Sequence, residues 1–167
     1  MNTREFKKYK FRKYDSRYPK LFQQEKIKLR KILGKSLKIE HIGSTAIRGS
    51  GGKGVIDILI GANKKNRNKI KNKLQKNNYR VPVGGDKNRI FLEKDYKHKR
   101  KIRRVHLHLV LKNSSAWKTP LKMREILRKD KKLAKEYGKI KRKAIKKAKG
   151  KGKIYRDAKK KFLDKLK

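Results

Sequence analysis

Residues 39–62 read IEHIGSTAIRGSGGKGVIDILIGA, and this stretch decides the fold. Two apolar runs, one ending at Ile42 and one beginning at Val55, flank a loop of glycine, serine and threonine. Apolar runs bounded by glycines predict short strands. Glycine allows a phosphate to approach the backbone, where hydroxyl and N–H groups donate to its oxygens. The one aspartate of the second run, Asp57, therefore follows a loop suited to phosphate.

The order of these residues favours a binding site over a set of isolated structural residues. Gly43, Ser44 and Thr45 directly follow the first strand, and we predict that they contact phosphate. Lys53 adds a point charge to the same loop. Asp57 lies on the next strand, a rigid platform for a metal ligand, and Mg²⁺ commonly bridges a carboxylate and phosphates. The alternative is an ordinary turn followed by an aspartate that is hydrogen-bonded to a loop.

Histidines add candidate ligands. His106 and His108 are two residues apart on a predicted strand, so both point to one face. Two imidazoles on one face could share a metal, with Asp57 as an oxygen ligand. The alternative is two histidines on a partly exposed face of the sheet, or one of them hydrogen-bonded inward. His41 directly precedes the Gly-Ser step. It could orient the loop or bind a phosphate, and the alternative is a structural hydrogen bond.

Two common nucleotide-binding motifs are excluded. Residues 49–54, GSGGKG, match the pattern G-x-G-x-x-G, but they precede a strand, whereas a dinucleotide-binding loop follows a strand and opens a helix. The P-loop pattern also fails, because Ile47 stands in place of its first glycine and Gly54 in place of its serine or threonine.

Periodicity predicts the rest of the secondary structure. Helical spacing of apolar residues predicts helices over 18–34, 64–78, 115–130, 131–150 and 153–167. Compact or alternating apolar runs predict strands over 36–43, 54–61 and 102–112, with two more strands within 79–96 joined around residues 84–86. This order predicts an α+β fold, with helices against one face of a mixed or antiparallel sheet.

Composition limits the class of protein. The chain has 167 residues, of which 34% are hydrophobic, enough for one domain with a core. Cysteine is absent, which excludes disulfides and thiolate metal sites. The N-terminal residues lack the apolar segment of a signal peptide, and no run is long enough to span a membrane. We therefore expect a soluble cytoplasmic protein with no membrane partner; no feature assigns an oligomeric state.

Charge suggests a polyanionic partner. Lys and Arg number 57 against 13 Asp and Glu, for a net charge of +44. Nucleic acid, nucleotides and anionic membrane surfaces all match such a charge. However, lysine is scattered over every segment instead of one face, so a compositional bias of the genome or a high-salt cytoplasm explains it equally well.

Five stretches resemble, in order, stretches of the GrpB family, a family grouped with the nucleotidyltransferase superfamily. They are residues 14–29, 39–61, 103–110, 117–144 and 155–166, so the resemblance covers nearly the whole chain. Its most specific part is the signature in 39–61, where a His-x-Gly-Ser-Thr step leads to a lysine and then to an Ile-Asp-Ile strand.

This resemblance implies a nucleotidyltransferase-like mixed sheet covered by helices, with C-terminal helices, in a single domain over 1–167. It implies that Gly43 and Ser44 grip nucleotide phosphates and that Asp57 holds Mg²⁺ or Mn²⁺. The chain departs from the superfamily at Leu59, which stands in place of a second metal-binding carboxylate. Arg48 and Gly54 also replace prolines that are usual in the family.

The resemblance therefore implies a protein that binds a nucleotide and a divalent metal, and that transfers a nucleotidyl group to an acceptor. One carboxylate poorly supports a two-metal mechanism. A one-metal site of Asp57, His106 and His108, or a nucleotide site without catalysis, is easier to build. The alternative function is a non-catalytic, highly basic RNA- or nucleotide-binding module. In such a module Tyr79, Phe91 and Tyr96 could stack on bases, although core packing is favoured for at least Phe91.

Overall fold

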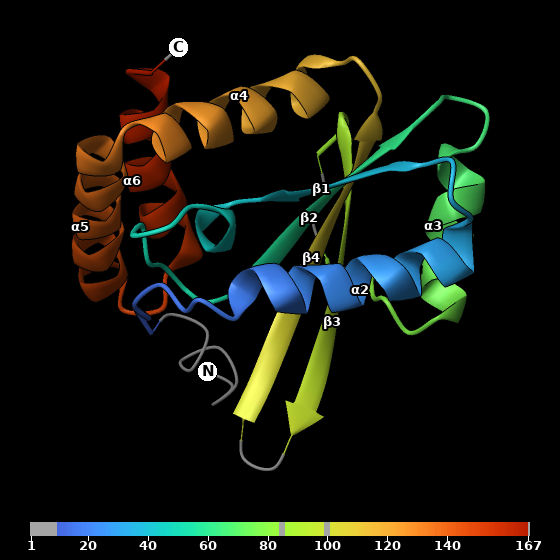
Figure 1. The fold of residues 1–167 in the computed structure, drawn as a ribbon, viewed down its shortest axis with the longest axis horizontal. Helices are drawn as coiled ribbons and strands as arrows, with labels where there is room; N and C mark the ends of the chain where they lie inside the picture. Colours follow the sequence, from blue (N-terminus) through green and yellow to red (C-terminus); the bar gives the residue numbers. More distant parts are fainter. Residues whose placement is uncertain (1–9, 84–85, 99–100, 167) are drawn as a thin grey trace.

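One four-stranded sheet forms the centre of the computed structural model, which describes residues 10–83, 86–98 and 101–166 (Figure 1). The strand order is β1-β2-β4-β3. Strand β2 pairs antiparallel with β1 and parallel with β4, and β3 pairs antiparallel with β4, so the sheet is mixed. The strands are β1 (Lys38–Ile42), β2 (Ile56–Ala62), β3 (Arg89–His98) and β4 (Lys101–Leu111).

The α-helices begin and end at residues suited to helix termini. They are α2 (Tyr18–Leu33), α3 (Arg67–Lys76), α4 (Ser115–Lys129), α5 (Lys131–Ala148) and α6 (Gly152–Asp164). Helix α2 has Pro19 in its first turn and is followed by Gly34, which has a φ of 89°. Ser114 and Asp130 cap α4 and α5 by accepting hydrogen bonds from backbone N–H groups. No helix within the described ranges is both long and apolar enough to cross a membrane.

The two faces of the sheet carry different residues, because side chains alternate along each strand. One face carries an apolar core that packs against α2 and α3; its β2 and β4 members are Ile56, Ile58, Ile60, Ala62, Val105, Leu107 and Leu109. On the other face Leu59 and Val110 pack with Trp117 of α4. Asp57, two residues before Leu59, therefore lies on this second face, beyond the part that α4 covers.

The α+β prediction and the predicted helices are confirmed, with two corrections. Helix α4 packs on the second face, so the expectation of helices against one face is wrong. The first of the two strands predicted within 79–96 does not form: Arg80 makes an isolated bridge with Glu93, and Pro82 has no N–H to donate to a ladder. Of the predicted joint at 84–86, residues 84 and 85 lie outside the described residues.

The loop between β1 and β2 connects the sheet to the C-terminal helices. Figure 1 shows it extending from the sheet toward α5 and α6. Gly138 of α5 packs directly on it, since a Cβ built on Gly138 would lie 2.1 Å from the Ser50 carbonyl oxygen. The stacked rings of Tyr137 and Phe162, 5.0 Å apart, hold α6 against α5. The position of the loop thus depends on helices far away in the sequence.

The substitution Gly138→Ala tests this contact. The added methyl would overlap a backbone atom that no side-chain rotation can move away, and overpacking costs about 1–3 kcal/mol. The gain in helix propensity offsets at most about 1 kcal/mol. We therefore expect urea unfolding to show a free energy of unfolding lower by about 1–2 kcal/mol. The exposed neighbour variant Lys139→Ala should change it by less than about 0.5 kcal/mol. Equal stability of the two variants would contradict the contact.

Candidate functional site

A carboxylate and two imidazoles meet on the second face of the sheet. Asp57 of β2 pairs in register with His106 of β4, and His108 follows on the same face. Asp57 Oδ1 lies 3.0 Å from His108 Nε2 and 3.3 Å from His106 Nδ1. The structure thus brings together the three residues that the sequence proposed as metal ligands. Their side chains are 12–23% exposed, so the cluster reaches the surface.

Strand β3 supplies a second ring of residues that the sequence did not single out as ligands. Arg89 Nη1 lies 3.2 Å from His108 Nδ1, and because arginine can only donate, Nδ1 must accept. His108 Nε2 then carries the ring proton and donates a hydrogen bond to Asp57 Oδ1. Phe91 packs edge-on against both imidazoles. Glu93 Oε2 lies 3.8 Å from His106 Nε2, a buried nitrogen with no hydrogen-bond partner in the described part of the chain.

These contacts set the charges of the cluster. Burial raises the pKa of Asp57, but the hydrogen bonds from His106 and His108 outweigh it and hold that pKa well below its usual value. Burial lowers the pKa of His108, and the nearby Asp57 opposes this only in part. At neutral pH the cluster therefore carries an ionised carboxylate hydrogen-bonded by a neutral His108.

The Gly-Ser step lies directly against this carboxylate. Gly43 has a φ of 73°, and a Cβ built on it would lie 2.6 Å from Asp57 Oδ2. Glycine is therefore required here both for the backbone conformation and for the close approach. Residues Ser44–Ala46 form a single 3₁₀ turn after it, and Ser44 is half-buried. Asp57 Oδ2 and the Gly43 backbone thus share one corner of the site.

His41 and Thr45 lie on the other face. His41 pairs in register with Ile58, is 6% exposed, and stacks on Phe22 at 4.6 Å. Thr45 is buried and donates to the Val55 carbonyl at 3.1 Å, so its hydroxyl accepts from His41 Nε2 at 3.0 Å. The structure does not bring these two residues to the Asp57 cluster. The contacts of His41 are those of a structural hydrogen bond next to the loop.

Several other predicted residues have different surroundings. Lys53 Nζ lies 4.6 Å over the ring of Tyr155 in α6. Leu59, at the place of a second carboxylate, is 1% exposed and apolar in its contacts. Tyr79 and Tyr96 donate their hydroxyls to Glu25 Oε1, and Tyr79 is 1% exposed, so it offers no ring face for stacking on a base.

Lys141 of α5, which the sequence did not single out, is wholly buried. Its Nζ donates to Ser50 Oγ at 2.6 Å and to the Gly51 carbonyl oxygen. Burial lowers the pKa of Lys141 to about 6. A signal was present, because Lys141 stands at the helical spacing of the apolar residues Tyr137 and Ala144. In a chain so rich in lysine, that signal is easily overlooked.

The metal prediction fits Asp57 better than it fits the histidines. Within the described residues, no group of three or more histidine or acidic side chains is arranged to hold a metal ion. His106 and His108 instead both approach one carboxylate oxygen as hydrogen-bond partners. Mg²⁺ prefers oxygen ligands and is often held by one carboxylate together with substrate phosphates, without a protein cage. Asp57 Oδ2, beside Gly43, suits that arrangement.

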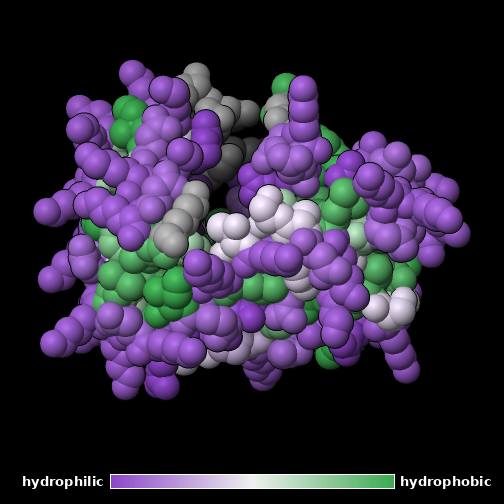
Figure 2. All heavy atoms as spheres, turned by 90° about the horizontal axis from the view of Figure 1, so that it is seen from above, coloured by the Kyte–Doolittle hydropathy of each residue, from purple (hydrophilic) through white to green (hydrophobic). Residues whose placement is uncertain are grey.

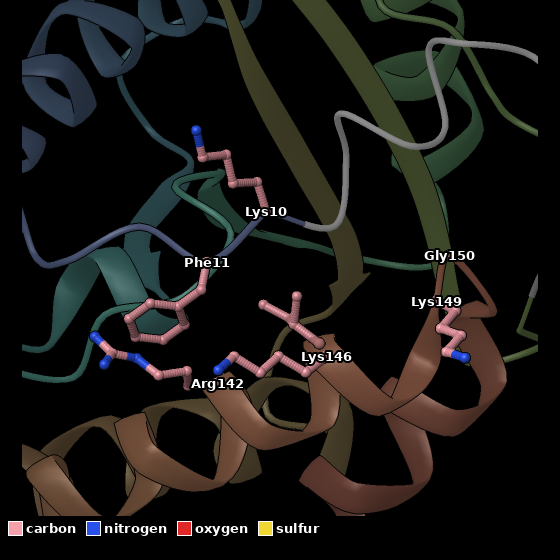
Figure 3. Close-up of a pocket in the computed structure, with 7 residues that line it drawn as sticks. Lys10, Phe11, Arg142, Lys146, Lys149 and Gly150 are labelled. Atoms are coloured by element: carbon pink, nitrogen blue, oxygen red, sulfur yellow. The ribbon is translucent and has the colours of Figure 1, made fainter.

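Two hollows lie away from this cluster. One of about 350 Å³ is lined by Phe11, Arg142 and Lys146, among others (Figure 3). In it the Arg142 guanidinium lies 4.6 Å from the Phe11 ring centre. The other, of about 320 Å³, lies between α5 and α6. Figure 2 shows hydrophilic residues over most of one face of the molecule, with smaller hydrophobic patches between them.

The mixed sheet, its flanking helices and the Gly-Ser step beside an acid on the next strand define a nucleotidyltransferase-like α+β fold. The structure is similar to that of the conserved protein GrpB from Enterococcus faecalis, with a TM-score of 0.71 and 24% identity. The match covers 94% of this chain and 99% of that one. The model of the GrpB protein family matches residues 8–167. The chain therefore belongs to the GrpB protein family.

Two curated proteins are also similar to this chain. The glutamate-rich protein GrpB of Alkalihalophilus pseudofirmus is 30% identical over 136 residues, which cover 77% of this chain and 76% of that protein. The UPF0157 protein BH1888 of Halalkalibacterium halodurans is 50% identical over 48 residues, which cover 28% of this chain and 25% of that protein's length. Family membership thus rests on nearly the whole chain.

Because His41 is buried, we predict that the folded protein loses stability in acid. Burial lowers the pKa of His41 to about 4, whereas in the unfolded chain it is near 6.5. Between these values the unfolded state binds a proton that the folded state does not, so stability falls as the pH falls from about 6.5 to about 4, by about 3 kcal/mol. The variant His41→Gln keeps an N–H donor but does not titrate. Urea unfolding at both pH values should show that the free energy of unfolding falls less for the variant than for the unmodified protein. An equal fall in both proteins would contradict the role of His41 in acid sensitivity.

Proposed function

We propose that this protein binds a nucleotide through its phosphates, together with Mg²⁺ or Mn²⁺, at the corner formed by Gly43, Ser44 and Asp57. The observation that carries the proposal is the contact of the Gly43 backbone with Asp57 Oδ2. It joins a glycine that gives a phosphate access to the backbone and an ionised carboxylate that can hold a cation.

Each residue of the cluster has a distinct part in this proposal. His106 and His108 occupy Asp57 Oδ1, and so orient the carboxylate with Oδ2 toward the loop. Ser44 can donate its hydroxyl to a phosphate oxygen. His41 and Thr45 hold the loop from the opposite face. Asp57 and a phosphate are both negatively charged and repel each other. A bound cation would neutralise part of this charge and so allow the phosphate to approach.

Transfer of a nucleotidyl group to an acceptor is the finer part of the proposal. Such transfer depends mostly on positioning and on neutralising charge. Because Leu59 is buried and apolar where a second carboxylate would stand, a two-metal clamp is not supported and one cation is proposed. The nucleotidyltransferase-like fold of the family is the support for transfer as the reaction class.

A second candidate function is favoured by the net charge of +44. A non-catalytic RNA- or nucleotide-binding module would use the exposed lysines, with no part for Asp57. Its affinity for single-stranded RNA would fall steeply with salt, because each neutralised phosphate releases counterions. This salt dependence separates it from the first function, in which the contacts with Asp57 and the loop are partly shielded from salt.

The variant Asp57→Asn tests the first function. At raised ionic strength, which screens the exposed lysines, ATP with Mg²⁺ should raise the melting temperature of the unmodified protein. The variant keeps the shape of the side chain but loses its charge, so we expect ATP–Mg²⁺ affinity to fall at least about tenfold. Isothermal titration calorimetry measures this, with Asp157→Asn, an exposed carboxylate of α6, as the matched control.

Two results would count against the first function. ATP–Mg²⁺ binding with the same affinity in both variants would exclude Asp57 from the site. RNA binding that is unchanged by Asp57→Asn and steep in salt, with no nucleotide binding, would favour the second function instead.

A further inference from the structure

Lys141 carries a buried amine whose hydrogen-bond partners are neutral. Its side chain is 0% exposed, and its Nζ donates to Ser50 Oγ and to the Gly51 carbonyl oxygen. The same Nζ lies 4.2 Å from the centre of the Tyr137 ring. No acidic side chain in the described ranges forms an ion pair with it. Burying an ammonium without a counter-charge is costly, whereas an anion placed beside it removes that cost. The position therefore favours an anion that comes from outside the chain.

The ammonium lies next to the proposed phosphate loop. A Cβ built on Gly52 would lie 2.5 Å from Ser44 Oγ and 3.5 Å from Lys141 Nζ, so these two groups flank the same glycine. Because both groups lie close to this one glycine, a phosphoryl group placed beside it could accept from both. A lysine side chain is long and flexible, so its ammonium can leave the Gly51 carbonyl for a phosphate oxygen without movement of the helix.

We propose that Lys141 is the cation that binds the phosphoryl group held by the Gly43–Ser44 loop. This inference rests on the proposed function and deepens it, because it names the positive charge that recognises the phosphate chain. The Gly138 contact brings α5 close enough to the loop for the side chain to reach. A helix more than eighty residues away in the sequence thus completes the site, and the predicted Lys53 lies instead over Tyr155.

The groups around Lys141 predict that phosphate binding is accompanied by the uptake of a proton. Tyr137 faces it from the same helix, Lys159 of α6 adds to the effect of burial, and Asp57 of β2 opposes it. Burial and, to a smaller extent, Lys159 outweigh Asp57 and lower the pKa of Lys141 to about 6, so without a ligand its amine is mostly neutral at pH 7.5. A phosphate dianion beside the amine raises its pKa, so binding takes up a proton. Exposed lysines are already protonated and take up none.

Ser50 and Lys141 also resemble the nucleophile and base of a serine–lysine pair. Ser50 is 1% exposed, however, so a substrate carbonyl has no access to its hydroxyl. The flexible lysine side chain can instead turn its amine toward an anion at the loop. The hydrogen bond to Ser50 is therefore the contact of the amine without a ligand.

Titration calorimetry tests the inference with ATP–Mg²⁺ and with inorganic tripolyphosphate. Binding is measured at pH 7.5 in two buffers of different ionisation enthalpy, at raised ionic strength. Lys141→Met should weaken tripolyphosphate binding about 10- to 100-fold and lose the proton uptake. The variant Lys141→Arg should bind tripolyphosphate without proton uptake, because arginine is already charged before binding. Lys143→Met, an exposed change of the same charge on the same helix, should match the unmodified protein.

The outcomes separate this inference from the proposed function. Unchanged affinity and proton uptake in Lys141→Met would overturn the inference, even where ATP–Mg²⁺ binding depends on Asp57. Binding of tripolyphosphate that depends on Lys141 would support it, even where Asp57→Asn leaves ATP–Mg²⁺ binding unchanged. If Lys141→Met fails to fold, equal proton uptake by Lys141→Arg and the unmodified protein would overturn it.

Discussion

The contact of the Asp57 carboxylate with the imidazoles of His106 and His108 is the interaction on which the site depends. It joins the two central strands, and their parallel register sets it. A shift of one residue in β2 would turn Asp57 toward the core beneath α2 and leave a buried carboxylate without partners. The register that buries Ile56, Ile58 and Ile60 is therefore the same register that builds the cluster on the opposite face.

The loop before β2 is held from three sides, and glycine permits two of these close approaches. Gly43 brings its backbone to Asp57, and Gly138 lets α5 reach the Ser50 carbonyl. On the other face, His41 and Thr45 fix the same loop from within the core. A loop so constrained can present its backbone to a ligand without losing much conformational freedom on binding, which is the benefit of preorganisation. The sheet and the C-terminal helices thus act on one segment.

Periodicity and local motifs predicted the parts that depend on near neighbours. The alternation around His106 and His108 gave their shared face, and the strand–loop–strand order brought Gly43 and Asp57 together. Contacts across the fold were not predictable in this way. Glu93 joins the cluster only through the pairing of β3 with β4, and Lys141 through the packing of α5. The phosphate role predicted for Lys53 rested on its neighbours in sequence, whereas in the fold this side chain lies over Tyr155.

The central claim is that the corner between the Gly43 loop and Asp57 receives nucleotide phosphates. Backbone amide NMR of the ¹⁵N-labelled protein, titrated with ATP and Mg²⁺ at raised ionic strength, tests it most directly. The account predicts that the largest saturable shift changes fall at Gly43, Ser44, Gly52 and Asp57. Changes spread over the exposed lysines of α3, α5 and α6, with these four amides unmoved, would contradict it.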